Sequence, residues 1–325
     1  MDNSGSPLSQ QPDAAEQRTV TTPVEPQRNV VFLGGRGLRS GWRLAIYILL
    51  VLLFSTAINF VARKIYPPTG GLPTPAQMLI QEAMGFALVF GCALIMGRIE
   101  KRSAGVYGLP AGSAFGKNFW LGMLFGVVEI CVLIGLISAF GGYSFGKLAL
   151  SGPDVARWGL FHLLLFTCVG LFEEFTFRGY MQYTLSDGIG FWPAAILLSL
   201  LFGAVHLKND NEGPVGAASV ALVGIFFAFT LYRTGNLWYA VGLHASFDWG
   251  ETFLFSVPNS GFVMQGHLSD SLLHGPAWLT GAKIGPEGSV FCFLTMGLQF
   301  LVVMWLFPKR KEAVVSRDVS SEALT

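Results

Sequence analysis

The chain has 325 residues, of which 52% are hydrophobic and only 13% are charged, so it is far more apolar than an ordinary soluble globular protein. Its formal net charge of +1 provides no broad basic or acidic surface, which argues against nucleic-acid binding. The four cysteines lie within apolar stretches, without the spacing of a metal site or a disulfide framework. The composition therefore places the chain in a lipid bilayer.

The predicted elements begin after a polar segment. Residues 1–40 are rich in Pro, Gln and Ser, which predicts a disordered tail. Apolar stretches of about 20 residues, long enough to cross a membrane as a helix, then follow one another. We expect eight such spans, with approximate bounds 42–62, 76–97, 116–140, 157–184, 191–208, 214–232, 237–255 and 288–307. The sequence therefore predicts an all-α, polytopic transmembrane helix bundle.

The turns between spans indicate how the chain is organised. Very short turns separate the four spans between residues 157 and 255, so these helices are expected to be antiparallel neighbours in a four-helix catalytic core. The other predicted segments are N-terminal transmembrane helices at 41–156, an extramembrane loop at 256–287, a last transmembrane helix at 288–307 and a solvated tail at 308–325.

Basic residues predict the orientation in the membrane. They cluster on one side of eight alternating spans, at Arg36, Arg39, Arg43, Arg98, Lys101, Arg102, Arg233, Lys309, Arg310 and Lys311. By the positive-inside rule, both termini are expected in the cytoplasm.

Ionisable residues inside the spans are candidates for function, because a charge at bilayer depth is costly and usually has a partner. These candidates are Glu82, Glu129, His162, Glu173, Glu174, Arg178, His206, His244, Asp248 and Glu251. Three of these residues lie close together in the stretch FEEFTFRGY at residues 172–180.

Within this stretch the two adjacent glutamates are predicted to differ. Glu174 and Arg178 are four residues apart on a helix, so their side chains meet and each offsets the burial of the other. Glu173 points about 100° away around the helix and lacks that partner. A desolvated carboxylate of this kind can both take and give a proton. The alternative for the cluster is a set of charges at a helix end that reach toward the interface.

The next span places a histidine at matching depth. Glu173 lies 15 residues before Gly188, and His206 lies 15 residues after Phe191, on either side of one turn. At the rise of an α-helix both positions are about 22 Å from that turn, so a contact between the two side chains is expected. Phe202, one turn before His206, is predicted to form an aromatic wall of the site.

The segment HASFD in the following span adds His244 and Asp248, which are four residues apart and share one helix face. Their estimated depths, about 12 Å and 18 Å, are shallower than that of Glu173. Spacing alone therefore leaves open whether these groups join the same site.

The motifs EEFTFRG, FGAVH and HASFD, in this order on three hydrophobic segments, resemble the CAAX protease and bacteriocin-processing family. These intramembrane endopeptidases are also called type II CAAX prenyl endopeptidase-like or abortive-infection proteins. The family pattern is EExxxR, then FxxxH, then HxxxN or HxxxD, and the match covers about residues 157–250. Asp248 stands where the better-studied members carry Asn.

The resemblance implies hydrolysis of a peptide bond within the membrane. Glu173 is then expected to be the general base that activates water together with His206. His244 and Asp248 are expected to stabilise the oxyanion, with His244 as the donor because an ionised Asp248 can only accept. Glu174 and Arg178 would form a structural ion pair. The expected partners are the bilayer and a membrane-embedded or lipidated peptide, and the expected location is a bacterial plasma membrane.

Three alternatives stay open at this point. Zinc held by Glu173, His206 and His244 could carry the water, although the sequence has no HExxH motif and the resemblance implies that no cofactor is needed. Buried Glu, His and Asp also build proton pathways, so a polytopic transporter is the second reading, and a catalytically silent membrane scaffold is the third. The sequence predicts no oligomeric state.

Overall fold

A computed structural model describes residues 33–34, 37–65, 73–209, 211 and 213–308. The predicted tails at 1–40 and 308–325 lie almost entirely outside the described residues. The chain divides into two units, residues 1–39 and 40–325. In the first unit, β1 (Leu33–Gly34) pairs antiparallel with β2 (Gly37–Leu38). The second unit holds the helices.

Helices dominate the second unit, which confirms the predicted all-α class. The long helices are α1 (Ser40–Ile65), α2 (Pro75–Glu100), α3 (Lys117–Ala139), α4 (Pro153–Arg178), α5 (Tyr180–Ile189), α6 (Phe191–His206), α7 (Pro214–Thr234), α8 (Trp238–Trp249) and α10 (Val290–Leu306). The short elements are η1 (Ala104–Tyr107), η2 (Ala111–Ser113), β3 (Tyr143–Ser144), η3 (Gly250–Leu254), β4 (Leu272–Leu273), α9 (Ala277–Thr280) and η4 (Pro286–Gly288). β3 and β4 pair antiparallel.

Local sequence explains where several helices begin and end. Proline occupies the first turn of α2, α4 and α7, where its missing N–H breaks no helical hydrogen bond. Thr74 and Gln77 form a capping box at the start of α2, with each side chain bonded to the backbone of the other. Gly235, in the left-handed conformation with a φ of 77°, ends α7.

The predicted helix at 157–184 is two helices in the structure. α4 ends at Arg178, and α5 begins at Tyr180 after a break at Gly179. A Cβ atom at Gly179 would overlap the carbonyl oxygen and the ring of Phe175, so only glycine allows the chain to pass here. The predicted helix at 237–255 is also modified, since α8 continues into the π-helical turn η3.

The described part of the chain has five helical segments long and apolar enough to cross a membrane: Ser40–Lys64, Pro75–Glu100, Lys117–Ala139, Pro153–Ile189 and Pro214–Thr234. α6 and α10 are apolar but shorter. Large apolar side chains also stand exposed along α1, among them Leu49, Leu52 and Phe60, as expected for a surface that faces lipid. The protein is therefore an integral membrane protein. Its orientation stays a prediction.

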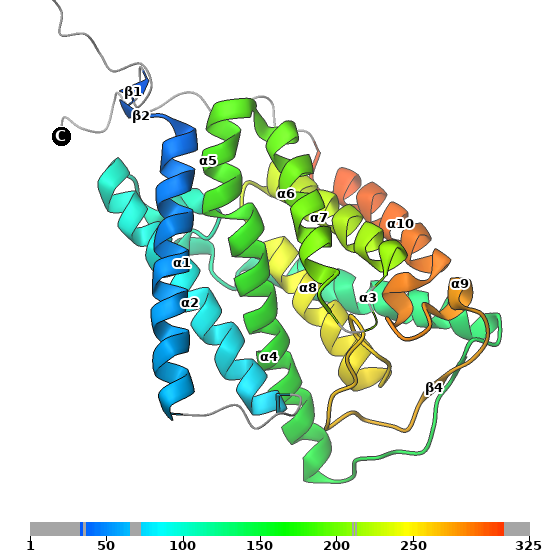
Figure 1. The fold of residues 1–325 in the computed structure, drawn as a ribbon. Coiled ribbons are helices and arrows are strands. Elements are labelled where there is room, and N and C mark those ends of the chain that lie inside the picture. The colour runs from blue at the N-terminus through cyan, green and yellow to red at the C-terminus, as the bar shows by residue number, and fades with distance from the viewer. Residues whose placement is uncertain (1–32, 35–36, 66–72, 210, 212, 309–325) are drawn as a thin grey trace, which may run out of the picture. The chain divides into compact units, whose positions relative to one another are not determined.

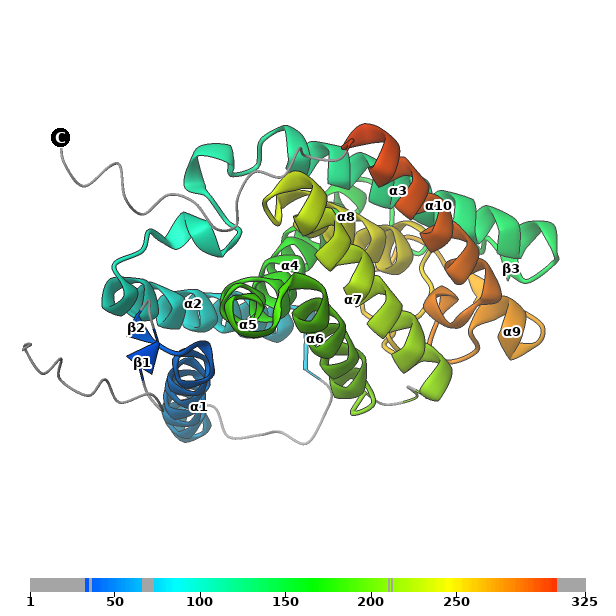
Figure 2. The same ribbon diagram turned by 90° about the horizontal axis from the view of Figure 1, so that it is seen from above.

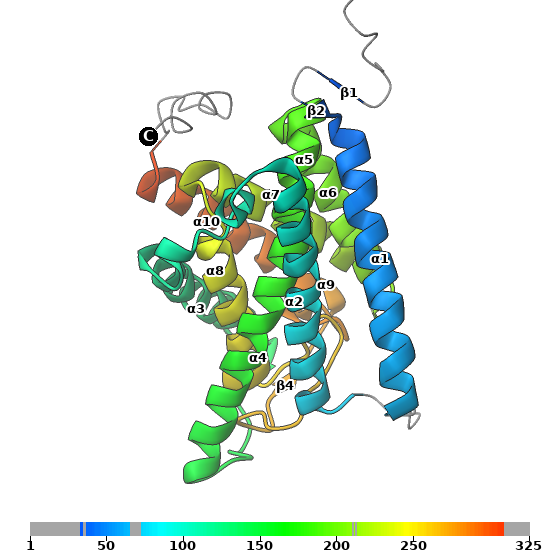
Figure 3. The same cartoon turned by 90° about the vertical axis from the view of Figure 1, so that its left-hand side faces the viewer.

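The helices are not all parallel. α1, α2 and α4 run side by side (Figures 1 and 3). In Figure 2, α1 and α5 are seen nearly end-on, whereas α3 and α10 run across the view. α8 lies at the centre, packed between α3 and α4. This central helix brings the HASFD motif next to the EEFTFRG motif of α4.

Glycines allow α3 and α8 to approach closely. A Cβ atom at Gly122 or Gly126 of α3 would overlap backbone atoms of α8, and one at Gly242 of α8 would overlap the backbone of Phe119. Small residues at such crossings let two backbones touch, which is how helices pack within membranes. The position of His244 and Asp248 therefore depends on this glycine contact.

A polar network ties α1, α2 and α5 together at one end. Arg43 contacts Glu100 at 2.6 Å and Asp187 at 2.8 Å, and Arg102 contacts the same two carboxylates at 3.5 and 3.9 Å. Arg102 also donates to Tyr183. Because Arg43 and Glu100 are largely buried, the network fastens the start of α1 and the end of α2 to the C-terminal half of α5.

Candidate functional site

One cavity of about 340 Å³ collects the acidic and histidine side chains. Its walls come from α2, α3, α4, α6, α7, α8, α10, η4 and the segment after η3. They are mainly apolar, with Phe166, Phe202, Phe226, Phe227 and Phe247 among them. The polar residues that line it include Glu82, Glu129, Glu173, His206, Asn209, His244, Asp248 and Glu287. Four of the residues predicted from the sequence, at 173, 206, 244 and 248, thus share one cavity.

The two adjacent glutamates of α4 have different surroundings. The Glu174 side chain is 0% exposed, whereas that of Glu173 is 24% exposed and lines the cavity. Arg178 lies one turn further along α4, and its Nη1 donates to Glu174 Oε1 at 3.2 Å. The structure therefore forms the expected pair and leaves Glu173 on the open side.

Arg178 is held by aromatic rings as well as by its carboxylate partner. Its guanidinium lies 4.4 Å from the ring centroid of Phe202 and 5.8 Å from that of Phe227. Its side chain is 1% exposed, so these contacts replace water around the charge. Phe202 thus serves both Arg178 and the cavity wall.

His244 of α8 is the residue that connects the two glutamates. Its Nδ1 lies 3.1 Å from Glu174 Oε1. On the other edge of the ring, Nε2 lies 3.4 Å from Asp248 Oδ2 and 3.7 Å from Glu173 Oε2. The Phe227 ring stacks on the imidazole, with 5.4 Å between centroids. Glu174 therefore orients His244 in addition to pairing with Arg178, a contact that sequence spacing could not indicate.

His206 lies at the end of α6 and lines the cavity opposite α8. Its Nδ1 is 2.9 Å from the Phe202 carbonyl oxygen, and its ring meets that of Phe202 edge-on at 4.6 Å. Donation from Nδ1 to this carbonyl leaves Nε2 without a proton, as an acceptor. The imidazole is therefore fixed in direction by its own helix.

Glu82 of α2 joins the site, although its position in the sequence assigned it no role. It lines the cavity, and its buried Oε2 has no hydrogen-bond partner in the described part of the chain. Glu129 of α3 lines another part of the cavity, beside Thr295 and Gln299 of α10. His162, predicted to lie outside the centre, is fully buried among aromatic rings.

The geometry bears on which residues could hold a metal ion. Among the described residues, Asp248, Glu251 and Glu287 are the one group whose ligand atoms lie within 4.8 Å of one another. Glu173, His206 and His244, the ligands of the zinc alternative, do not form such a group in this conformation.

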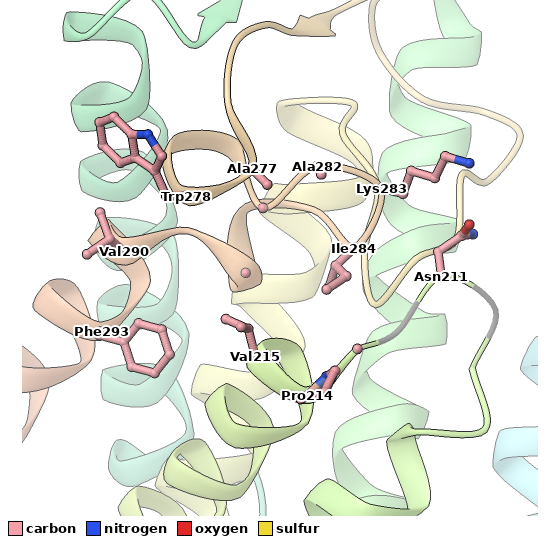
Figure 4. Close-up of a pocket in the computed structure, with 13 residues that line it drawn as sticks. Asn211, Pro214, Val215, Ala277, Trp278, Ala282, Lys283, Ile284, Val290 and Phe293 are labelled. Carbon is pink, nitrogen blue, oxygen red and sulfur yellow. The ribbon is translucent and has the colours of Figure 1, made fainter.

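A second cavity, of about 640 Å³, lies between the start of α7, α9 and the start of α10. Figure 4 shows its wall, with Trp278, Val290 and Phe293 on one side and Asn211 and Lys283 on another. Among the described residues, its lining lacks the paired acidic and histidine side chains needed for acid–base chemistry. The candidate site is therefore the smaller cavity.

Comparison with known proteins identifies the segment that builds this cavity. Comparison with curated proteins gave no match. Residues 156–250, in contrast, match the sequence model of the type II CAAX prenyl endopeptidase Rce1-like family. This segment runs from the first turn of α4 to the end of α8 and contains all three motifs. Residues 156–250 are therefore similar to the type II CAAX prenyl endopeptidase Rce1-like family.

Proposed function

We propose that the protein is an intramembrane endopeptidase that hydrolyses a peptide bond of a membrane-embedded or lipidated peptide. One observation carries the proposal: Glu173 lines a cavity between helices together with His206, His244 and Asp248, while its neighbour Glu174 is withdrawn from that cavity. The family match implies a protease and agrees with this chemistry.

In the proposed mechanism Glu173 is the general base. Its carboxylate accepts a proton from a water molecule as the water oxygen attacks the carbonyl carbon of the scissile bond. His206 would hold this water through Nε2, the nitrogen that its hydrogen bond to Phe202 leaves as an acceptor. When the tetrahedral intermediate collapses and the C–N bond breaks, Glu173 returns the proton to the leaving amine.

His244 is assigned to the oxyanion. Carboxylates face both of its ring nitrogens, so an imidazolium can donate from Nδ1 to Glu174 and present Nε2–H toward the cavity. Asp248 Oδ2 lies 3.4 Å from the same Nε2 and holds the ring before substrate binds, and the single Nε2–H then turns from Asp248 to the carbonyl oxygen as negative charge develops there. A fixed donor of this kind stabilises the negative charge that develops on the carbonyl oxygen. Glu174 and Arg178 act as positioning residues for His244.

The cavity also supports the substrate class. Aromatic side chains supply much of its wall, which suits an apolar peptide segment delivered from the bilayer. No step above requires a metal ion. Zinc on the same residues stays an alternative, and it predicts that chelation abolishes cleavage.

The proposal is tested with purified protein in proteoliposomes and a panel of membrane-anchored peptides, with products identified by mass spectrometry. Glu173→Gln and His206→Ala are expected to reduce cleavage by about 10²–10⁴-fold. Asp154→Asn is the matched control, because it removes a carboxylate from the exposed start of the same helix. Cleavage that survives Glu173→Gln would exclude this mechanism, and proton flux without cleavage would favour a transporter.

A further inference from the structure

Three carboxylates from two distant parts of the chain meet beside the proposed active site. Asp248 lies in the last turn of α8, Glu251 in the π-helical turn η3, and Glu287 in the 3-10 helix η4. One oxygen from each of these side chains lies within 4.8 Å of the other two. Like charges at such distances repel one another strongly unless something between them is positive.

The burial of Glu251 makes this cluster unusual. Glu251 is 0% exposed, and neither of its carboxylate oxygens has a hydrogen-bond partner in the described part of the chain. Removing an ionised carboxylate from water costs several kcal/mol unless an opposite charge compensates for it. The two neighbouring carboxylates add to this cost rather than offset it.

The other two members of the cluster have partners of their own. Asp248 contacts His244 Nε2 at 3.4 Å. Glu287 accepts hydrogen bonds from the backbone N–H and the hydroxyl of Ser260, each at 3.0 Å. A carboxylate offers about four acceptor positions, so hydrogen bonds from protein groups do not prevent it from also binding a cation.

The surrounding backbone is shaped around Glu251. Gly285 has a φ of 118°, and a Cβ atom there would lie 3.2 Å from Glu251 Oε1 and would overlap the Pro258 carbonyl. Only glycine therefore lets the segment that carries Glu287 approach Glu251 so closely.

We infer that Asp248, Glu251 and Glu287 form a binding site for a divalent cation of the size of Ca²⁺. Carboxylate oxygens are the ligands that hard divalent cations prefer. Ca²⁺ accepts about six to eight oxygen ligands in flexible arrangements, whereas Mg²⁺ requires near-ideal octahedral geometry. Three carboxylates from separate elements, with one oxygen of each within 4.8 Å of the others, supply part of the flexible shell that Ca²⁺ accepts.

The site is open to ions and coupled to His244. Asp248 and Glu287 both line the 340 Å³ cavity, which provides a route for entry and space for the remaining water ligands. An ion here fixes Asp248, and through it the Nε2 side of His244. It also fastens the segment containing Glu287 to the end of α8. The cation site does not depend on the proposed peptidase activity.

The test measures calcium binding rather than activity. Purified full-length protein in detergent, stripped with chelator and dialysed, is titrated with Ca²⁺ by isothermal titration calorimetry, and the same samples are followed by thermal unfolding. The variants are Glu251→Gln and Glu287→Gln. Glu129→Gln is the matched control, because it removes another buried carboxylate of the cavity, one that does not belong to the acidic group.

We expect one Ca²⁺ per wild-type chain, an unfolding temperature that rises with Ca²⁺, and the same behaviour for Glu129→Gln. Glu251→Gln and Glu287→Gln should each weaken binding at least tenfold and lose the thermal shift. Glu287 is only half-buried, so its variant keeps the test decisive if Glu251→Gln does not fold. Absence of wild-type binding up to about 10⁻³ M, the weak limit for protein calcium sites, would overturn the inference. Undiminished binding by both variants would overturn it as well.

Discussion

Replacement of Arg178 by Met removes the positive charge at the centre of the site while keeping a long side chain. Glu174 is fully buried and would lose its Arg178 contact of 3.2 Å, keeping only the contact with His244. Loss of one partner from a buried ion pair typically costs about 3–5 kcal/mol. The guanidinium also lies 4.4 Å from the Phe202 ring, a contact worth up to about 2 kcal/mol when desolvated. We therefore expect the free energy of unfolding to fall by about 3–5 kcal/mol. A loss in the upper half of that range would include the lost contact with the Phe202 ring.

A double variant separates charge from shape. In Arg178→Met combined with Glu174→Gln, the buried side chain at position 174 is neutral and needs no cation, so more than half of the lost stability should return. Activity should stay low, because the amide holds the His244 imidazolium less firmly than a carboxylate does. Stability and activity should therefore respond differently to the second substitution.

The assay is reversible unfolding in mixed micelles of mild detergent and SDS, followed by circular dichroism. Arg157→Met is the matched control on the same helix, because its ion pair with Asp154 is exposed and should contribute at most about 1 kcal/mol. If Arg178→Met costs no more than Arg157→Met, the assignment of a buried structural pair is refuted. A double variant less stable than the single one would refute the charge argument.

Three further predictions concern the packing and the site. Gly126→Ala places a methyl group against Ser246 and the Leu243 carbonyl of α8, and it should lower the free energy of unfolding by about 1–3 kcal/mol in the same assay. Gly135→Ala is the control and should be neutral, because the space around Gly135 is open. Equal effects of the two substitutions would contradict the close α3–α8 contact. Asp248→Asn should keep more of the cleavage rate than Asp248→Ala, because the amide oxygen of asparagine can still accept a hydrogen bond from His244 Nε2. The reverse order would argue against orientation of His244 by residue 248. Arg43→Met removes the short contacts of Glu100 and Asp187, which are buried and part-buried, and should destabilise the protein by about 3 kcal/mol. An unchanged thermal unfolding temperature would show that the network is dispensable.

Much of the helical architecture follows from composition. An apolar stretch of about 20 residues has few stable conformations in a bilayer other than a helix, so the eight predicted stretches correspond to helices or helix pairs in the structure. The break at Gly179 could not be predicted, because glycine is common within membrane helices and only the nearby Phe175 backbone reveals why it is needed.

Contacts within one helix could be predicted, and contacts between helices could not. The four-residue spacing predicts that Glu174 meets Arg178, and that His244 meets Asp248, because residues at this spacing face each other. The contact of Glu174 with His244 joins positions 70 residues apart and depends on how α8 crosses α4. Depth estimates from a straight helix could not establish it, because tilt and the break after Arg178 change the geometry.

The acidic cluster shows a further limit of sequence patterns. Asp248 and Glu251 were visible as charges in a predicted span, but Glu287 belongs to a segment interpreted as an extramembrane loop. The structure returns this segment to the end of α8, where its carboxylate approaches the other two. Neither periodicity nor residue spacing predicts that a distant loop segment folds back onto the end of a helix.

The central claim is that the two adjacent glutamates of α4 have different tasks, with Glu173 as the base and Glu174 as a support. The single-turnover rate of peptide cleavage by Glu173→Gln, measured in proteoliposomes beside its unfolding free energy, tests this claim most directly. We predict that the rate falls by about 10²–10⁴-fold while stability stays within about 1 kcal/mol of wild type. The Glu173 side chain is 24% exposed, and loss of its 3.7 Å contact with His244 leaves that imidazole two closer carboxylates, Glu174 and Asp248. A wild-type rate in this variant would contradict the assignment.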